Sequence, residues 1–344
     1  MSAVRLGVTM PIEDGMSAPD LVRLAQVSEA CGVDTVLCGE VAGPEVMAIL
    51  GAIAASTERV RLASGIIAAY TRTPALTAMG FATLSSLAPG RIVAGVGASS
   101  PIVVGRWHGL DFESPYSRTK EFVEALRACF AGGKVDYEGA HVAVKDFRLA
   151  MDPEGNVPVW LAAMNPRMLR LAGATADGVF LTWCRPDEIA DKLAEVHAGA
   201  RAAGRNPSDV EVVCSFWGYA GPRTEEVTDR LRRVVLSYAT VPTHAAAFVE
   251  AFPSLGQATE AWNAGDRKAA LALVDESVVH DLCAVSEDGS SSADFARRYT
   301  EAGVDLPVVL AIGAGNGDHE GPFSTVRLTA ERLGLVADVS PARS

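Results

Sequence analysis

Short apolar runs alternate along the chain with longer segments in which apolar residues recur every three or four positions. Runs of about four to eight apolar residues are typical of buried strands, and the wider spacing indicates one face of a helix. The apolar runs predict strands at 4–10, 34–39, 60–67, 91–97, 157–163, 177–183, 210–218 and 306–313. The segments after them predict helices at 17–32, 44–56, 74–87, 114–133, 166–174, 186–203, 224–239 and 321–334. About eight such units indicate an α/β protein with a (β/α)8 TIM barrel.

Two segments depart from this repeat. Residues 134–150 contain "KVDYEGAHVAV", which predicts a small hairpin. Residues 240–303 are mostly helical in pattern and fall between the seventh and eighth strands, so we expect an insertion that could act as a lid. Without a proline- or serine-rich linker, we expect one barrel domain over 1–335 and a loose tail at 336–344. An open doubly wound sheet would carry G-x-G-x-x-G after its first strand, where this chain has "TMPIEDGMSAP".

Composition narrows the classes of function. The formal net charge is −12, which argues against binding to nucleic acid or an anionic membrane, because both need a basic face. We find no apolar run long enough for a transmembrane helix and no signal peptide. The six cysteines lack C-x-x-C spacing and the six histidines are scattered, so we expect reduced thiols, a cytoplasmic protein and no metal site.

The ends of the predicted strands carry small residues. In a barrel of this kind the chemistry lies at the carboxyl ends of the strands. The third strand, in "LASGIIAAYTRTP" (62–74), ends at Ser64-Gly65-Ile66, and the sixth ends at Thr182. Others end in Gly39-Glu40, in Gly97-Ala98-Ser99 and in Ala162-Ala163-Met164-Asn165. Residues of this size leave room for a flat ligand against the backbone, which suits a planar cofactor better than a small charged substrate.

Polar residues at these ends allow more than one reading. Glu40 could act as a base, hydrogen-bond a cofactor, or cap the helix predicted at 44. Thr73, Ser114 and Asn165 precede prolines that would open helices, so each is a plausible N-cap. Helix N-termini at a barrel mouth are natural anion sites, although proline at the first helical position is common in any α/β protein.

The motifs "GVDTVLCGE", "RVRLASGIIAAYTRTPALTA", "GRIVAGVGASSPIVVGRWHG", "VPVWLAAMNPRMLRLAGATADGVFL" and "YATVP" together resemble the luciferase-like flavin and deazaflavin oxidoreductases. More narrowly they resemble the branch that uses coenzyme F420, which includes methylenetetrahydromethanopterin reductase. The resemblance covers roughly residues 4–335. It implies a hydride transfer at the deazaflavin C5 to or from a small organic substrate, in an enzyme that is commonly a homodimer. The alternatives are an FMN-dependent monooxygenase and a non-catalytic F420-binding protein.

The resemblance also implies where F420 would lie. A cis peptide or bulge would back the ring at Gly65-Ile66, and Gly39 with Glu40 would contact it. The remaining contacts would fall on Gly97, Ala98 and Ser99, and on Ala163, Met164 and Asn165, beside Ser64, Ala162 and Thr182. Sugar-phosphate dehydrogenases of this family carry histidine in place of Glu40 and an acid in place of Ala98. These differences argue against a sugar-phosphate substrate and leave the role of Glu40 open.

Overall fold

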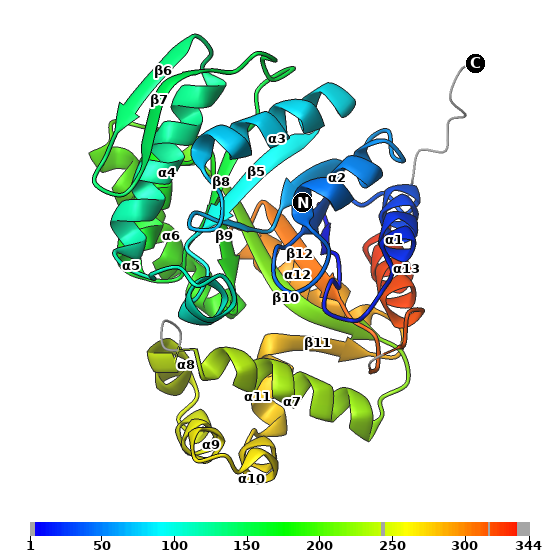
Figure 1. The fold of residues 1–344 in the computed structure, drawn as a ribbon. Helices are drawn as coiled ribbons and strands as arrows, with labels where there is room; N and C mark the ends of the chain where they lie inside the picture. The colour runs from blue at the N-terminus through cyan, green and yellow to red at the C-terminus, as the bar shows by residue number, and fades with distance from the viewer. Residues whose placement is uncertain (1–3, 242–244, 316, 336–344) are drawn as a thin grey trace, which may run out of the picture.

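Eight parallel strands close into a barrel in the computed structural model, which describes residues 4–241, 245–315 and 317–335 (Figure 1). In order around the barrel they are β1 (Gly7–Thr9), β2 (Thr35–Cys38), β3 (Arg61–Ser64), β5 (Ile92–Gly97), β8 (Val159–Ala162), β9 (Gly178–Thr182), β10 (Glu211–Ala220) and β12 (Leu306–Ala311). Pairing of β12 with β1 completes the ring. The predicted (β/α)8 fold is therefore confirmed. The predicted tail at 336–344 lies outside the described residues.

Helices cover the outside of the barrel. They are α1 (Ala18–Ala30), α2 (Val46–Ala54), α3 (Pro74–Leu87), α4 (Pro115–Phe130), α5 (Pro166–Thr175), α6 (Ile189–Ala202), α12 (Ser290–Glu301) and α13 (Gly321–Leu333). The sequence sets these limits locally. In α1, for example, the Ser17 hydroxyl caps the Asp20 amide at 3.3 Å, and Leu21, Leu24 and Ala25 form the buried face. None of the described helices is long and apolar enough to cross a bilayer.

The predicted hairpin is confirmed as β6 (Lys134–Glu138) and β7 (Ala143–Arg148), which pair antiparallel beside α4 (Figure 1). The Glu121 carboxylate of α4 accepts hydrogen bonds from the backbone amides of His141 and Val142, at 2.7 and 3.0 Å. The hairpin is thus tied to the barrel's outer layer and adds no strand to the barrel.

The insertion begins after α7 (Glu225–Ala239). It contains α8 (Ala245–Ala251), α9 (Ser254–Asn263), α10 (Arg267–Ala272) and α11 (Glu276–Leu282), which gather at one end of the barrel (Figure 1). A strand that the sequence pattern did not predict follows them, β11 (Cys283–Ser286). It pairs with residues 217–220 of β10, while β9 pairs with residues 211–215. The long strand β10 therefore leaves the barrel and becomes part of the insertion.

The inside of the barrel is layered because alternate residues of each strand point inward. The middle layer is apolar and fully or almost fully buried: Leu37, Ala63, Val93, Trp160, Phe180, Val213, Leu306 and Val308. Trp160 is the largest of these side chains. A Cβ on Gly178 would lie 2.4 Å from the Trp160 ring, so the neighbouring strand must carry glycine at this position. The barrel is thus filled across its middle, and its two ends are separate surfaces.

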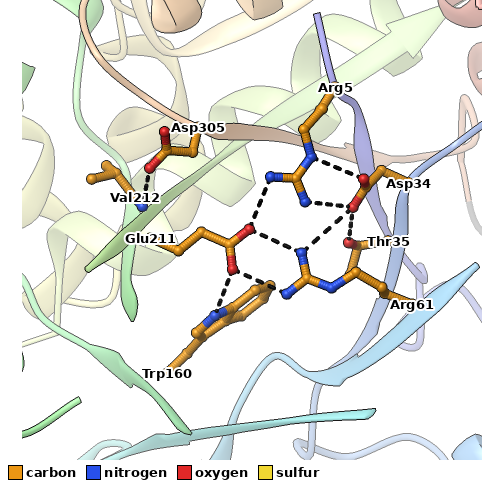
Figure 2. Close-up of polar contacts among 8 residues, drawn as sticks. All are labelled: Arg5, Asp34, Thr35, Arg61, Trp160, Glu211, Val212 and Asp305. Carbon is orange, nitrogen blue, oxygen red and sulfur yellow. Dashed lines mark hydrogen bonds and ion pairs between the residues drawn. The ribbon is translucent and has the colours of Figure 1, made fainter. Parts of the chain in front are cut away.

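Charged side chains close the amino end of the barrel (Figure 2). The Arg5 guanidinium donates to both oxygens of Asp34, each at 2.9 Å, and to Glu211 at 3.1 Å. Arg61 donates to both oxygens of Glu211, at 2.9 and 3.0 Å, and the Trp160 indole donates to the same carboxylate at 3.1 Å. We call these residues (Arg5, Asp34, Arg61 and Glu211) the base ring.

The base ring keeps its carboxylates ionised. Burial alone would raise the pKa of Glu211, but hydrogen bonds and charge interactions with Arg61 and Arg5 lower that pKa overall. Burial likewise opposes a net lowering of the pKa of Asp34, which comes from Arg5, Thr35 and Arg61. Because every charge in the base ring has an opposite partner within the ring, this end of the barrel is suited to stability rather than to ligand binding.

Candidate functional site

The carboxyl end of the barrel is lined by small or uncharged residues. They continue the inward-facing positions beyond the middle layer, and we call them the mouth ring: Thr9, Gly39, Ile66, Gly97, Ala162, Thr182, Ser215 and Leu310. Ile66, Ala162 and Thr182 are partly exposed, whereas the inward-facing residues of the middle layer on the same strands, Ala63, Trp160 and Phe180, are buried. The barrel is therefore open at this end, over a floor that carries no charge.

The third strand is interrupted at the mouth. The Ser64 hydroxyl donates to the Gly95 carbonyl at 2.7 Å and accepts from the Gly95 amide at 2.8 Å. The Gly65-Ile66 peptide is cis, as predicted, and pairing with β5 resumes at the two-residue strand β4 (Ile67–Ala68). A Cβ on Gly95 would lie 1.9 Å from the Ser64 carbonyl oxygen, so glycine is required there. The buried Ser64 hydroxyl thus bridges the gap between two strands.

Glu40, at the end of β2, is held by Arg72 from the loop before α3. Both carboxylate oxygens accept from Arg72 Nε at 3.1 Å, and Arg72 also pairs with Glu45. Hydrogen bonding to Glu40 is the largest cause that raises the pKa of Arg72. The helix cap considered for Glu40 is instead made by Glu45, whose carboxylate accepts from the Ala48 amide at 2.7 Å. Glu40 is therefore one half of an ion pair at the rim.

Two of the three predicted helix caps are present. The Thr73 hydroxyl accepts from the Leu76 amide at 3.3 Å, and the Asn165 side chain accepts from the Met168 amide at 3.0 Å. The cap predicted at Ser114 is wrong. Its backbone is left-handed, with φ of 49°, and its side chain makes no cap hydrogen bond.

The other predicted residues lie around the same opening. Ala98 and Ser99 are partly exposed after β5, and Ser99 has a left-handed backbone with φ of 64°. Ala163 is buried, and its amide donates to the Phe180 carbonyl at 3.1 Å. Met164 packs against a second hydrophobic cluster, formed by buried residues of α7 to α11 with Trp183 and Trp217. The Thr182 hydroxyl accepts from Ser215 at 3.0 Å, which links β9 to β10.

The sequence pattern did not lead us to an acidic pair that follows β1, because the end of the first predicted strand was not among the candidate positions. Glu13 and Asp14 lie in the loop that follows it, and Asp14 is buried against Arg230 of α7. Burial is the largest cause that raises the pKa of Asp14, and Arg230 offsets it in part. Burial, followed by the Asp14 charge, raises the pKa of Glu13. Reading every strand end in turn would have found both carboxylates.

Two curated relatives resemble this chain over about three-fifths of its length. A 5,10-methylenetetrahydromethanopterin reductase of Methanolobus tindarius is 31% identical over 208 residues, which are 60% of this chain and 63% of that protein. An F420-dependent glucose-6-phosphate dehydrogenase of Mycolicibacterium fortuitum is 30% identical over 229 residues, which are 61% of this chain and 67% of that protein. The chain thus spans less than two-thirds of the reductase's length.

The barrel also matches a solved structure over nearly its full length. The coenzyme F420-dependent tetrahydromethanopterin reductase of Methanopyrus kandleri superposes with a TM-score of 0.80 at 22% identity, covering 96% of this chain and 100% of that one. At this identity the match supports the fold. The family model described as luciferase-like monooxygenase matches residues 4–306, which is most of the sequence. The chain therefore belongs to the luciferase-like monooxygenase family.

Proposed function

We propose that this protein is an oxidoreductase that uses coenzyme F420 and transfers a hydride to or from a small organic substrate. The two curated relatives, a methylenetetrahydromethanopterin reductase and an F420-dependent dehydrogenase, support this class of reaction. The observation that carries the proposal is the mouth ring, an uncharged floor of small residues at the end where barrels of this kind bind ligands.

The residues of the mouth fit a flat, largely neutral ring. Side chains would be crowded at two points, because a Cβ on Gly39 would lie 3.1 Å from the Gly65 carbonyl oxygen and one on Gly97 would lie 3.0 Å from Cδ1 of Ile66. Thr9 offers a buried hydroxyl that has no hydrogen-bond partner among the described residues, which a polar edge of the ligand could satisfy. A charged ligand core would find no partner on this floor.

Catalysis by this chain would consist mainly of positioning and exclusion of water. F420, when bound, supplies a hydride donor or acceptor at C5 of its deazaflavin ring. Ile66, Ala162 and Thr182 would support one face of the ring, and Gly97 with Ala98 and Ser99 would pass beside it. Glu40 would hold the cofactor's edge or orient the substrate rather than act as a free base, because Arg72 already occupies both of its oxygens.

Binding titrations with F420 and with FMN, each followed by absorbance and fluorescence, test the cofactor assignment. We expect an F420 dissociation constant at least about tenfold below that of FMN. Tight FMN binding without F420 binding would favour the monooxygenase reaction of the family and overturn the proposal. Tight F420 binding with no turnover across alcohols, aldehydes, ketones and enones would instead identify a cofactor-binding protein.

We also place the protein in the cytoplasm, as a homodimer. All six cysteines are free thiols, which fits a reducing compartment. The dimer is supported by the outer faces of α2 and α3, which contain no Asp, Glu, Lys or Arg from Val46 to Ala54 or from Pro74 to Leu87. Leu76, Met79 and Leu87 of α3 are each about half exposed, at 52, 51 and 50%. In a chain of net charge −12, an uncharged face can meet its own copy without repulsion.

Light scattering after size exclusion tests the dimer. Leu76→Glu with Met79→Glu would place like charges opposite each other across a two-fold interface, so we expect this variant to elute as a monomer. Leu273→Glu, at a leucine of the insertion that is 37% exposed, is the matched control and should leave the dimer intact. A monomeric parent protein, or a dimer that survives both α3 changes, would contradict this assignment.

A further inference from the structure

Helix α7 lies across the carboxyl end of the barrel. Residues on one stripe of this helix, spaced by multiples of four, contact residues that follow β12, β1 and β9. A Cβ on Gly315, after β12, would lie 1.9 Å from the Glu226 carboxylate, so this side chain covers that loop. Three turns further along, the centroid of the Tyr238 ring lies 4.8 Å from the ring centroid of Trp183, the residue after β9. The helix therefore runs from the end of β12 toward the end of β9, on the side of the barrel where Figure 1 shows the insertion.

Arg230 lies between these two points and joins three elements. Its guanidinium pairs with the Asp14 carboxylate and donates to the Gly313 carbonyl at 2.9 Å. The Gly313 amide in turn donates to the other Asp14 oxygen at 3.2 Å. These contacts link three elements to one another: the loop after β1, helix α7 and the end of β12. The side chains are only 14% and 5% exposed, so the pair is far less screened than a surface ion pair.

The same helix carries the insertion. Val227, Leu231 and Val235 line its buried face, and with residues of α8, α9, α10 and α11 they form a second hydrophobic cluster. Trp183 and Trp217 bring the ends of β9 and β10 into that cluster. A shift of α7 would therefore move the helices of the insertion and the aromatic side chains beside the mouth together.

We propose that Asp14 and Arg230 are positioning residues: their ion pair, closed by Gly313, fixes α7 across the mouth and so sets where Tyr238 and Trp183 stand over the bound substrate. We call α7 together with α8, α9, α10 and α11 the cover of the active site. That the cover encloses a substrate and F420 rests on the proposed function. Arginine suits this task because its rigid planar fork fixes the directions to a carboxylate and a backbone carbonyl together, whereas the lysine ammonium is a point charge on a flexible stem.

The chain offers a control with the same kind of contacts at a more exposed position, where the two side chains are 36% and 31% exposed. Arg127 of α4 also combines an ion pair with a backbone carbonyl, since it contacts Asp177 at 2.7 Å and the Thr175 carbonyl at 2.8 Å. Asp177 directly precedes β9, at the opposite end of the barrel from the mouth. Arg127→Met therefore removes the same kind of interaction, from a helix that does not cover the site.

Hydrogen–deuterium exchange on the protein without cofactor is the first readout, because it needs neither F420 binding nor turnover. We expect Arg230→Met and Asp14→Asn to speed amide exchange in 225–239 by at least about tenfold while 115–130 keeps its protection. Arg127→Met should give the reverse pattern. Unchanged protection of 225–239 in both variants at the mouth would overturn the proposal, and so would equal loosening of that helix by Arg127→Met.

Iodide quenching of bound F420 is the second readout. Loosening of α7 should raise the quenching constant in Arg230→Met and leave it unchanged in Arg127→Met, and the KM of an identified substrate should rise more than the F420 dissociation constant. Arg230→Lys, which keeps the charge but not the fork, should fall between the parent and Arg230→Met. If F420 does not bind at all, the proposed function fails while the exchange experiment still decides whether this pair holds α7.

Discussion

Replacing Glu211 by glutamine separates the two ends of the barrel experimentally. This carboxylate accepts hydrogen bonds from Arg5, Arg61 and the Trp160 indole. A glutamine keeps the size of the side chain but removes the charge and points an NH2 group at groups that are themselves donors. Two arginines would then share Asp34 alone within the base ring. We therefore expect a loss of stability without any change at the mouth.

The size of the loss follows from the burial of the ring. Hydrogen bonds to a charged group contribute about 1.5–3 kcal/mol each when well buried. The side chains of Glu211 and Arg61 are 20% and 24% exposed, and that of Arg5 is 39% exposed, so solvent screens part of this energy. A total loss of about 2–3 kcal/mol is reasonable for Glu211→Gln, well above the roughly 0.2–1 kcal/mol of an exposed pair. In a chain of this length it corresponds to a fall in Tm of about 3–4 °C.

Urea denaturation at several pH values measures this loss and its origin. The folded-state pKa of Glu211 is lowered, so its contribution is fully present above the unfolded value of about 4.3 and disappears as the pH falls through the folded value. The difference between the parent and Glu211→Gln should therefore be constant near neutral pH and shrink below roughly pH 4. Glu195→Gln, at the more exposed pair with Arg170, is the control and should cost under about 1 kcal/mol.

A change in F420 binding at the mouth would refute this reasoning. Glu211→Gln should bind F420 as the parent does, because the apolar middle layer separates the base ring from the mouth. Weakened F420 binding in a variant that remains folded would mean that the two ends are coupled. A loss of stability no larger than that of Glu195→Gln would mean that the base ring contributes little.

Three further substitutions probe the barrel interior and the rim. Ala162→Leu adds bulk to the mouth ring, so the F420 dissociation constant should rise at least about tenfold while the free energy of unfolding in urea changes by less than about 1.5 kcal/mol. Gly178→Ala should cost about 1–3 kcal/mol in the same urea assay, because the new methyl group meets the Trp160 ring. Arg72→Met leaves the Glu40 carboxylate, whose side chain is 19% exposed, without its partner, and should lower the free energy of unfolding by about 1–3 kcal/mol.

The barrel could be predicted from the sequence because its signals are local. Strand and helix periods repeat through the chain, and the segment 74–87 coincides with α3 at both ends. The hairpin likewise follows from alternation within a few residues. The strand β11 was missed because four residues, "CAVS", after a helical segment carry no period of their own. It is a strand only because the far end of β10 lies beside it after β9 has ended.

The candidate site was predictable in position but not in detail. Collecting strand ends located most of the mouth ring, since small residues are visible in any sequence. The bridging role of Ser64 depends on where Gly95 lies in the next strand, and the partner of Glu40 is 32 residues away in Arg72. The amphipathic pattern of α7 shows that one of its faces is buried, yet it cannot show that the helix crosses the mouth instead of lining the barrel wall.

The layers of the barrel explain why stability and binding can be placed in different residues of the same strands. β10 contributes Glu211 to the base ring, Val213 to the middle layer and Ser215 to the mouth ring, in steps of two residues along one strand. The first is held by two arginines and the last by one neutral hydrogen bond to Thr182. Paired charges close one end, while the inward-facing positions at the other end carry no charge and leave backbone and small side chains open to a ligand. The chemistry of an inward-facing position is thus related to its depth in the barrel, as the three inward-facing residues of β10 show.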